Sequence, residues 1–599
     1  MASVSSEALR QSIRRKSRLK GRRADADSVA QVREALGARP RDGWPRDRLI
    51  EHLHLLNDRH RGLFERHLVA LAQETGLAMA EVYEVATFYH HFDVLGDDEQ
   101  APALTIRVCD GLACEMAGAQ SLLGRLAARA DVDVRVVAAP CVGRCEQAPA
   151  VVVGQCPVPF ADADKVLAAV AAGQTHHPRA DAGAAFDPAV AAGGRVGDRL
   201  AAVAPAFVDY DSYVAGGGYA LAAAAIGGAL DAAEVLRSLD DSALRGFGGA
   251  GFPAGRKWRI VREQPAPRLM AVNIDEGEPG TFKDRTYLER DPHRFLEGML
   301  IAAAVVGVEA CYVYLRDEYH GCRDLLAAEL VVLQRRAPFA LPRIELRRGA
   351  GAYICGEESA MLESIEGKRG EPRMRPPYIA SVGLFGRPTL EHNFETLYWV
   401  RDILGRGAAW FAGHGRNGRS GLRSFSVSGR VREPGVKLAP AGITLNELIA
   451  EYCGGMAEGH ALYGYLPGGA SGGILPARLA DLPLDFDTLQ PHGVFIGSAA
   501  VIVLGTGDTA KAAALNAMRF FAEESCGQCT PCRIGTDKAA RLMAQARWDR
   551  STLEDLSVAM ADASICGLGQ AAPNPLLSVY RHFAHEVDTE AQAPAGQAP

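Results

Sequence analysis

Eight of the thirteen cysteines fall into two sets whose spacing is typical of iron–sulfur ligands. Two sites of four thiolates each constrain the fold, because every site must bring distant segments of the chain to one point. They also indicate one-electron transfer. The first set is Cys109-x4-Cys114 and, 26 residues later, Cys141-x3-Cys145; the second is Cys526-x2-Cys529-x2-Cys532 and, 33 residues later, Cys566.

Length and composition exclude several classes of protein. With 599 residues, 48% of them hydrophobic and 23% charged, the chain is long enough for several buried cores. The net charge of -7 argues against a nucleic-acid binder. Thirteen cysteines are too few for a disulfide scaffold of this length, so they indicate thiolates in a reducing compartment. No stretch of ~18 apolar residues is present, so we expect a cytoplasmic protein without a membrane span.

The chain begins with a strongly basic segment. Its first 23 residues contain eight Lys or Arg and one acid, Glu7. No apolar run follows, as a signal peptide would require, and Arg14-Arg15 lacks the apolar run of a twin-arginine signal. We therefore expect a disordered tail.

Hydrophobic periodicity divides the chain into helical and mixed segments. A helical bundle is expected first, then a small β-α-β domain with the first cysteine set, an Ala/Gly/Pro-rich linker, and a larger domain whose alternating strands and helices favour a parallel sheet. A small, mainly β insert and a final helical segment follow. The expected boundaries are 1–27 (tail), 28–100 (bundle), 101–172 (β-α-β domain), 173–206 (linker), 207–422 (parallel-sheet domain), 423–503 (β insert), 504–586 (helical segment) and 587–599 (tail).

The second cysteine set favours a [4Fe-4S] cluster. Three cysteines at x2-x2 spacing wrap one tight turn, which Gly527 and Pro531 help to form, and Cys566 completes the site. Zinc is the competing interpretation, although four-cysteine zinc sites usually consist of two pairs. The first set does consist of two pairs, which suits a [2Fe-2S] cluster with two ligands for each iron. Structural zinc stays open there as well.

Three loops rich in glycine and acids indicate a crevice for a nucleotide cofactor. The first, Arg245 to Trp258, has five glycines in ten residues but does not follow a strand, so it is no Rossmann fingerprint. The second, Asn273 to Asp284, and the third, Gly349 to Glu358, each follow a predicted strand. Ligands bind at such strand ends in open α/β sheets.

These motifs carry a resemblance to a known family. The glycine loop, N-x-D-E-G-E-P-G-T-F-K-D, G-A-G-A-Y-I-C-G-E-E and E-S-C-G-Q-C-T-P-C-R-I-G with I-C-G-L-G-Q resemble the flavin- and NADH-binding subunit of respiratory complex I. Residues 28–172 resemble the thioredoxin-like [2Fe-2S] subunit of that enzyme. The fusion of the two resembles the β (diaphorase) subunit of NAD-dependent molybdenum- or tungsten-containing formate dehydrogenase. Residues 208–219 and 466–476 look most similar to that version.

The resemblance implies an α/β multidomain fold, cofactors and site residues. It implies a helical bundle with a thioredoxin-like ferredoxin domain, a Rossmann-like FMN/NADH domain, a β-grasp-like insert that belongs to the soluble-ligand-binding type, and a C-terminal helical bundle with an iron–sulfur cluster. FMN, NAD(H), one [4Fe-4S] and one [2Fe-2S] cluster are the implied cofactors. The implied FMN contacts are Gly246, Gly248, Gly249, Asn273, Asp275, Glu276, Tyr353 and Gly356, and Glu357 is a further cofactor-binding residue. The implied NADH contacts are Phe252, Lys257, Tyr378, Glu278 and Glu358, of which the last two position the carboxamide.

Two positions depart from the family pattern. His392-Asn393 stands where the family usually has Asn-Asn, which puts the FMN contact of the first position in question. Phe247 stands where many members have Arg, which alters the charge beside the phosphates.

Three functions remain open at this point. In the first, a metal–pterin formate dehydrogenase subunit with further iron–sulfur clusters delivers electrons to this chain, which reduces NAD. We expect neither nucleic acid nor a membrane as a partner. In the second, the chain is the diaphorase subunit of an NAD-reducing hydrogenase or a fused NADH-dehydrogenase module of complex I. Retention of the first cysteine set favours the first, because some hydrogenase relatives lose those ligands. The third is a non-catalytic iron–sulfur module that senses redox state and lacks a flavin crevice.

Overall fold

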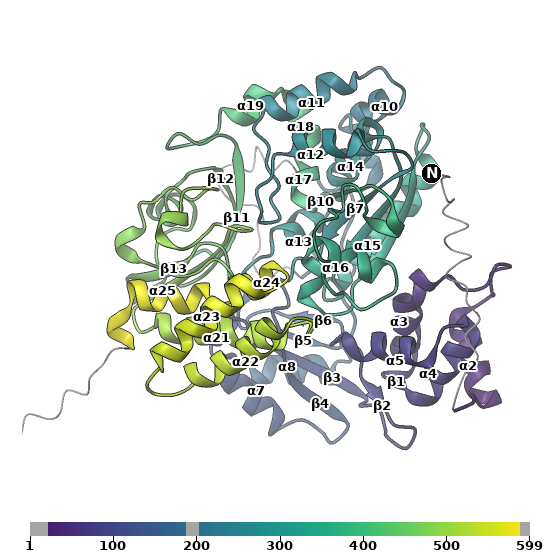
Figure 1. The fold of residues 1–599 in the computed structure, drawn as a ribbon, viewed down its shortest axis with the longest axis horizontal. Helices are drawn as coiled ribbons and strands as arrows, with labels where there is room; N and C mark the ends of the chain where they lie inside the picture. Colours follow the sequence, from purple (N-terminus) through teal and green to yellow (C-terminus); the bar gives the residue numbers. More distant parts are fainter. Residues whose placement is uncertain (1–21, 187–202, 588–599) are drawn as a thin grey trace, which may run out of the picture.

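The computed structural model describes residues 22–186 and 203–587. The predicted basic tail lies mostly outside these residues, as do part of the predicted linker and nearly all of the predicted C-terminal tail. Figure 1 shows the bundle and the ferredoxin domain along one side of the molecule and the parallel-sheet domain and the β insert along the other. No helix within the described residues is long and apolar enough to cross a bilayer.

The N-terminal bundle packs four amphipathic helices around a core of aliphatic side chains such as Leu53, Leu68 and Val82. The first helix within the described residues, α2, begins at Ala26, because the Asp25 side chain accepts a hydrogen bond from the backbone N–H of Ser28. The expected tail to residue 27 therefore overlaps a helix. The elements are α2 (Ala26–Leu36), α3 (Leu49–His60), β1 (Leu63–Phe64), α4 (Glu65–Thr75), α5 (Met79–Phe88) and β2 (Val94–Leu95).

The ferredoxin domain has a four-stranded sheet in the order β4-β3-β5-β6. Strands β3 and β4 are parallel and are joined through helix α7, as the change of hydrophobic period predicts, while β5 and β6 run antiparallel. The elements are β3 (Leu104–Cys109), α6 (Leu112–Met116), α7 (Ala119–Ala127), β4 (Val134–Ala139), η2 (Cys145–Gln147), β5 (Val151–Val153), β6 (Cys156–Val158) and α8 (Ala163–Ala171).

The large central domain contains the predicted parallel sheet, in the order β10-β7-β8-β9. The edge strand β10 was not predicted, because its sequence Thr-Leu-Glu-His-Asn lacks an apolar run although Glu391 and His392 are buried. The strands are β7 (Arg268–Ile274), β8 (Val308–Leu315), β9 (Arg343–Arg348) and β10 (Thr389–Asn393). The helices are α9 (Tyr210–Ala215), α10 (Ala220–Ile226), α11 (Ala232–Asp241), α12 (Ala254–Arg262), α13 (Lys283–Leu288), α14 (Pro292–Val306), α15 (His320–Arg336), α16 (Glu358–Ile365), α17 (Phe394–Tyr398), α18 (Val400–Arg406) and α19 (Ala408–Ala412).

The β insert and the helical segment complete the fold. The insert is a five-stranded mixed sheet, β12-β11-β15-β13-β14, and the C-terminal helices lie between it and the ferredoxin domain (Figure 1). Asn516 of α21 donates a 2.9 Å hydrogen bond to the backbone carbonyl of Asp110, beside the first cysteine set. The elements are β11 (Leu422–Gly429), β12 (Gly435–Pro440), α20 (Leu445–Glu447), β13 (Leu462–Leu466), β14 (Leu475–Pro476), β15 (Ala500–Gly505), α21 (Ala510–Glu523), α22 (Thr530–Met543), α23 (Arg550–Ala563), α24 (Gly567–Ala571) and α25 (Asn574–His582).

Candidate functional site

The first cysteine set converges at one end of the ferredoxin sheet. Cys109 ends β3, Cys114 lies in α6, and Cys141 and Cys145 flank the turn after β4, with their Sγ atoms 3.3 Å apart. All four are buried. Hydrogen bonds from the Cys109 and Cys145 thiols, helped by the Arg316 guanidinium, hold the pKa of Cys141 well below its usual range. Four buried sulfurs that converge on one point fit the two-pair ligand set of a [2Fe-2S] cluster.

The second set brings a tight loop and a remote cysteine together in the C-terminal helices. Cys532 lies in the first turn of α22, and Cys566 immediately precedes α24. A Cβ atom on Gly569 would lie 2.9 Å from Cys532 Cβ, so only glycine lets these two segments meet. Gly527, at φ +79°, turns the chain between Cys526 and Cys529 as predicted. This three-plus-one arrangement fits a [4Fe-4S] cluster.

Two asparagines lie side by side at the carboxyl edge of the parallel sheet. Asn393 of β10 is the register partner of Asn273 of β7. The Asn273 side-chain amide donates a 2.9 Å hydrogen bond to the Gly356 carbonyl, and its oxygen accepts from the backbone N–H of Asp275 at 3.0 Å. The second and third predicted loops therefore meet at this edge, where open α/β sheets bind ligands.

The glycine loop closes over the same edge. A Cβ on Gly248 would lie 3.1 Å from Asn393 Cβ, and one on Gly251, at φ +64°, would lie 2.6 Å from the Phe486 ring of the insert. Gly249, at φ +133°, faces open space instead. The loop is thus held on one side by protein, while the backbone at Gly249 is open to a flat or phosphorylated ligand.

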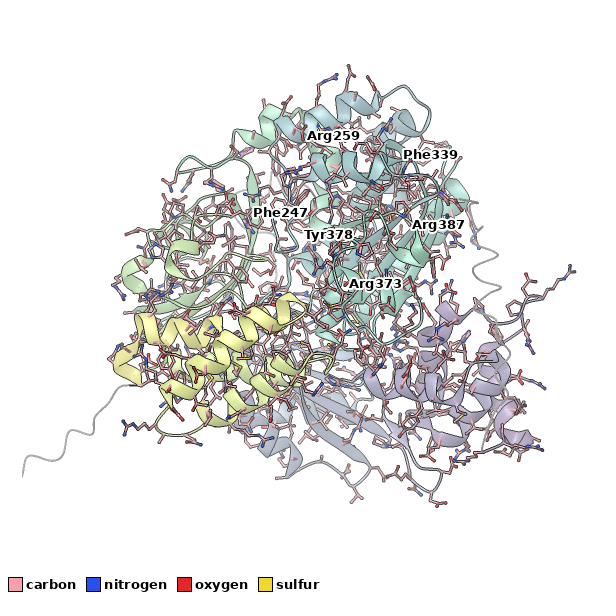
Figure 2. The ribbon with its side chains drawn as sticks, viewed as in Figure 1. Phe247, Arg259, Phe339, Arg373, Tyr378 and Arg387 are labelled. Atoms are coloured by element: carbon pink, nitrogen blue, oxygen red, sulfur yellow. The ribbon has the colours of Figure 1, made fainter. Side chains whose placement is uncertain are left out.

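Phe247 lies between the central domain and the insert (Figure 2). The buried Arg423 guanidinium is 5.7 Å from the centre of its ring and 4.0 Å from that of Phe486. Position 247 therefore lacks the positive charge that many family members carry there. The Arg423 guanidinium of β11 supplies a positive charge next to the Phe247 ring instead.

Helix α12 contacts β10 through Lys257, which was predicted as a site residue, and through its neighbour Trp258. The ammonium of Lys257 pairs with the Glu391 carboxylate at 2.6 Å, and the Trp258 indole donates a 2.7 Å hydrogen bond to His392 Nε2. Burial, and then the charge of Lys257, lowers the pKa of His392 well below its usual range, so the imidazole is neutral. Because Trp258 occupies His392 Nε2, direct contact between that nitrogen and FMN is not available, and the FMN contact of His392 stays a prediction.

Asp275 and Glu276 are adjacent in sequence but differ in their surroundings. Asp275 Oδ2 is buried without a hydrogen-bond partner among the described residues, and burial raises the pKa of this carboxyl well above its usual range. An orphaned buried oxygen is costly, so a hydroxyl or N–H of a bound molecule fits there. The Glu276 carboxylate instead accepts from the N–H groups of Asp284 and Arg285 at 2.8 and 3.1 Å and from the Tyr319 hydroxyl at 2.9 Å. Its predicted contact with FMN therefore rests on the resemblance alone.

Glu278 joins three segments. Its carboxylate accepts hydrogen bonds from the Tyr353 hydroxyl, and from the backbone N–H and hydroxyl of Ser471, both at 2.8 Å. Burial is the main cause of its raised pKa. Ser471 was not predicted as a site residue, although it lies in the glycine-rich stretch 466–476 that carries part of the resemblance.

The remaining predicted residues lie around the start of α16. Glu357 caps this helix by accepting from the N–H groups of Ser359 and Ala360, both at 2.9 Å. Arg375, which the sequence did not single out, pairs with both Glu357 and Glu358. Phe252 and Tyr378 are exposed, 38% and 61% respectively, as suits aromatic faces that await a ligand.

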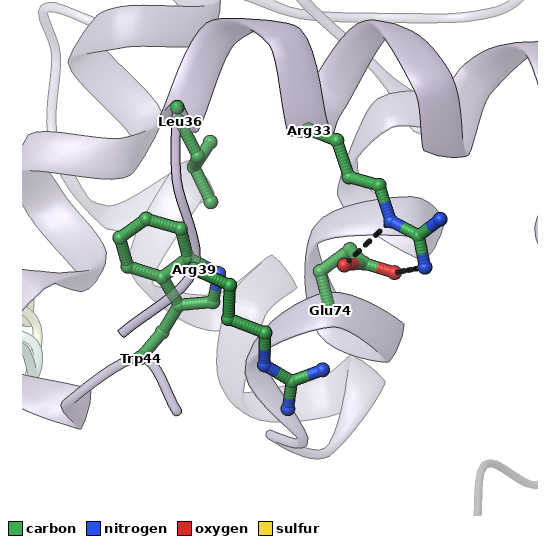
Figure 3. A pocket seen from close by; sticks show the side chains of 6 residues that line it. Arg33, Leu36, Arg39, Trp44 and Glu74 are labelled. Carbon is green, nitrogen blue, oxygen red and sulfur yellow. Dashed lines mark hydrogen bonds and ion pairs between the residues drawn. The ribbon is translucent and has the colours of Figure 1, made fainter. Parts of the chain in front are cut away.

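A separate hollow of about 300 Å³ lies in the N-terminal bundle (Figure 3). Arg33, which is paired with Glu74 at 2.9 Å, lines it together with Trp44 and Arg39. None of the predicted site residues contributes to its lining, so it is separate from the predicted cofactor site at the sheet edge.

Comparisons with known protein families agree with this geometry. Residues 36–174 match the thioredoxin-like [2Fe-2S] ferredoxin family, residues 239–402 match the Nuo51 FMN-binding domain, and residues 512–590 match the NADH-ubiquinone oxidoreductase-F iron-sulfur binding region. The chain therefore holds FMN with NADH, a [2Fe-2S] cluster and a [4Fe-4S] cluster, as predicted.

Curated relatives and solved structures extend the match. The F2 subunit of the NADH-quinone oxidoreductase of Rhizobium meliloti is 39% identical over 390 residues, which is 63% of this chain and 92% of the relative. The mitochondrial NADH dehydrogenase [ubiquinone] flavoprotein 1 of Dictyostelium discoideum is 40% identical over 373 residues, which is 59% of this chain and 78% of the relative. An NAD+-reducing [NiFe]-hydrogenase structure in the H2-reduced state superposes with TM-score 0.76 and 32% identity over 90% of this chain and 92% of that chain.

Proposed function

Because the chain belongs to the family of F-type NADH-quinone oxidoreductase subunits, we propose that it is the diaphorase subunit of an NAD-dependent formate dehydrogenase. The coarser function is an NAD-dependent FMN and iron–sulfur oxidoreductase subunit. The formate assignment rests chiefly on one observation: the four cysteines of the first set are all retained and converge in one buried site.

The residues of the crevice have distinct roles in this proposal. The glycine loop, Asn273 and Asp275 hold FMN, whose chemistry is to exchange a hydride on one side and single electrons on the other. Glu278 and Glu358 would position the nicotinamide carboxamide, and Phe252 and Tyr378 would bind the adenine. No general acid is needed for hydride transfer, so the protein contributes position and the exclusion of water. The thiolates of Cys526, Cys529, Cys532 and Cys566 hold the cluster that exchanges electrons with the flavin site.

The overall reaction balances across two subunits. On a molybdenum- or tungsten-pterin partner that also carries iron–sulfur clusters, formate is oxidised to CO2 with release of two electrons and a proton. On this chain NAD+ takes up two electrons and a proton to become NADH. The second candidate, the diaphorase of an NAD-reducing hydrogenase, is favoured by the superposition with the hydrogenase structure.

Affinity purification of the full chain from its native host, followed by mass spectrometry and activity assays, tests the proposal. We expect a molybdenum- or tungsten-pterin oxidoreductase in the complex, together with formate-dependent reduction of NAD+. A nickel–iron subunit with hydrogen-dependent reduction of NAD+ would contradict formate and favour the second candidate. Oxidation of NADH with ferricyanide by the isolated chain checks the flavin site independently, because it needs no partner.

A further inference from the structure

Two histidines and an aspartate cluster where the N-terminal bundle meets the central domain. His54 and Asp58 lie four residues apart on α3, and His91 follows α5. One ligand atom from each of these three residues lies within 4.8 Å of the other two. We propose that His54, Asp58 and His91 bind a divalent transition-metal ion of the zinc class. The proposal is independent of the formate assignment.

His54 presents a free ring nitrogen in a buried position. Its Nε2 lies 2.8 Å from the Gly349 carbonyl, which can only accept, so Nε2 carries the proton. Its Nδ1 is therefore a lone-pair acceptor, and it is buried without a partner among the described residues. His54 is only 2% exposed. The lone pair of such an unprotonated nitrogen can bind a metal ion.

His91 is oriented in the complementary way. Its Nδ1 lies 2.8 Å from the Asp317 carboxylate, so Nδ1 is the donor and Nε2 keeps its lone pair. The Asn57 side-chain amide lies 3.4 Å from that Nε2. Metal-binding histidines characteristically donate their other N–H to a carboxylate or a backbone carbonyl, and here one histidine does each. This pairing of outer partners is the observation that favours metal ligands over two ordinary hydrogen-bonded histidines.

Charged side chains from α3, α15 and β9 surround the cluster. Asp58 and Asp317 are the carboxylates that face the cluster, and Arg348 lies between them, 2.5 Å from an oxygen of each. Arg323 and His320 of α15 also contact Asp317. The guanidiniums of Arg348 and Arg323 thus offset the charge of the two carboxylates, and an ion would take over part of the pairing between Asp58 and Arg348.

The three ligand atoms need to move only a short distance toward one another to bind an ion. Around a zinc ion with bonds of ~2.0–2.2 Å, ligand atoms lie roughly 3.5 Å apart, about an ångström closer than the 4.8 Å limit found here. Asp58 can supply this movement, since its side chain is 42% exposed. Three protein ligands leave the fourth position to water.

Such an ion would fasten the bundle to a cofactor loop. The backbone N–H of His91 already donates a 3.1 Å hydrogen bond to the Ala350 carbonyl, and a Cβ on Gly351 would lie 3.2 Å from His91 N. Gly349, Ala350 and Gly351 open the loop that leads to Tyr353. Metal binding would therefore hold the start of this loop against the N-terminal bundle.

Zinc binding by the full chain with its clusters assembled tests the proposal. After chelator treatment, the protein is equilibrated with Zn²⁺, desalted, and analysed for metal content and by X-ray absorption at the zinc edge. We expect about one zinc per chain with a shell of nitrogen and oxygen ligands at ~2.0–2.1 Å, distinct from sulfur at ~2.3 Å. Asp58→Asn should weaken zinc binding on the order of 10-fold, and His91→Gln on the order of 100-fold.

The matched control is Asp211→Asn. Asp211 is also an exposed aspartate paired with an arginine through both oxygens, Arg336, but it lies on α9 away from the cluster. The Asp211→Asn variant should leave zinc binding unchanged. If His91→Gln loses iron and flavin, and so fails to fold, the half-exposed Asp58 variant decides. A sulfur shell, no zinc above background, or equal zinc content in native protein and Asp58→Asn would overturn the proposal.

Discussion

The indole N–H of Trp258 donates a 2.7 Å hydrogen bond to Nε2 of His392, and both side chains are fully buried. The pair explains why a histidine is accepted at a position where the family usually has asparagine. The imidazole supplies the acceptor that a buried indole N–H requires. It also fixes β10 against α12, where Lys257 pairs with Glu391 of the same strand.

Replacement of His392 by leucine should destabilise the protein. The substitution leaves the Trp258 N–H unpaired in a buried site, which costs about 1–3 kcal/mol in the free energy of unfolding. Urea-induced unfolding followed by tryptophan fluorescence measures this loss. In a Trp258→Phe background the same change should cost clearly less, because the donor is absent. Equal costs in the two backgrounds would show that the hydrogen bond does not stabilise the fold.

Removal of the charge of Lys257 should weaken binding of the phosphorylated cofactors. Lys257 lies on α12 directly after the glycine loop and is held by Glu391 at 2.6 Å. We expect Lys257→Met to raise the Kd for FMN or the KM for NADH about tenfold, which corresponds to ~1.4 kcal/mol. Flavin fluorescence and steady-state kinetics with ferricyanide distinguish the two effects.

Glu391→Gln is the partner control for that variant. It removes the carboxylate that holds Lys257 but leaves the ammonium in place, so FMN and NADH binding should be unchanged or tighter. If Glu391→Gln weakened binding as much as Lys257→Met, the ion pair would be a structural element rather than a source of positive charge for the ligand.

Each cysteine set should be removable without loss of the other. The two sets lie in separate domains, and no described cysteine belongs to both. Cys529→Ala should remove about four irons per chain and Cys114→Ala about two. Cys156→Ser, a partly exposed cysteine outside both sets, should remove none. Iron analysis and electron paramagnetic resonance of the reduced protein measure this, and loss of both signals in either variant would contradict independent sites.

Much of the fold follows from local patterns. The change from a helical to a two-residue period placed the ferredoxin domain, and strands separated by helices predicted the parallel sheet, because both signals come from neighbouring apolar residues. Strand β10 escaped prediction, since its burial depends on Glu391 pairing with Lys257 and His392 pairing with Trp258, each 134 residues away.

The site was predictable only as a set of motifs. Cysteine spacing predicted both ligand sets because each cluster imposes its own geometry on the chain. The sequence could not show that the Glu276 carboxylate binds the start of α13, or that Ser471 reaches Glu278 from 193 residues away. Those contacts depend on how the insert packs against the central domain, and no local pattern encodes that packing.

Gly251→Ala should disturb the contact between the glycine loop and the insert. The residue has φ +64°, and an added Cβ would lie 2.6 Å from the Phe486 ring, so strain and overlap act together. We expect a loss of about 1–3 kcal/mol in the free energy of unfolding and weaker retention of flavin. Gly228→Ala is the control, because it has φ +75° but open space around it. If both variants lose flavin equally, backbone strain rather than the Phe486 contact is responsible.

The stability of the N-terminal bundle should fall as the pH drops below 6.5. His67 of α4 is fully buried, and its Nε2 lies 2.7 Å from the Gln31 side-chain oxygen of α2. Burial, and then the charge of His60, lowers the pKa of His67 to about 4. The unfolded chain therefore binds a proton near pH 6.5, before the folded protein does. The contribution of His67 to the free energy of unfolding is therefore fully present above pH 6.5, and on the order of 2–3 kcal/mol of it is lost between pH 6.5 and about 4.

Hydrogen exchange of the amides of α2 and α4 across this pH range measures the loss of stability. His67→Gln, which keeps an N–H for Gln31 but cannot take up a proton, should reduce the pH dependence, while buried histidines such as His52, whose pKa burial lowers to about 4, account for the remainder. An unchanged pH dependence would show that His67 does not contribute.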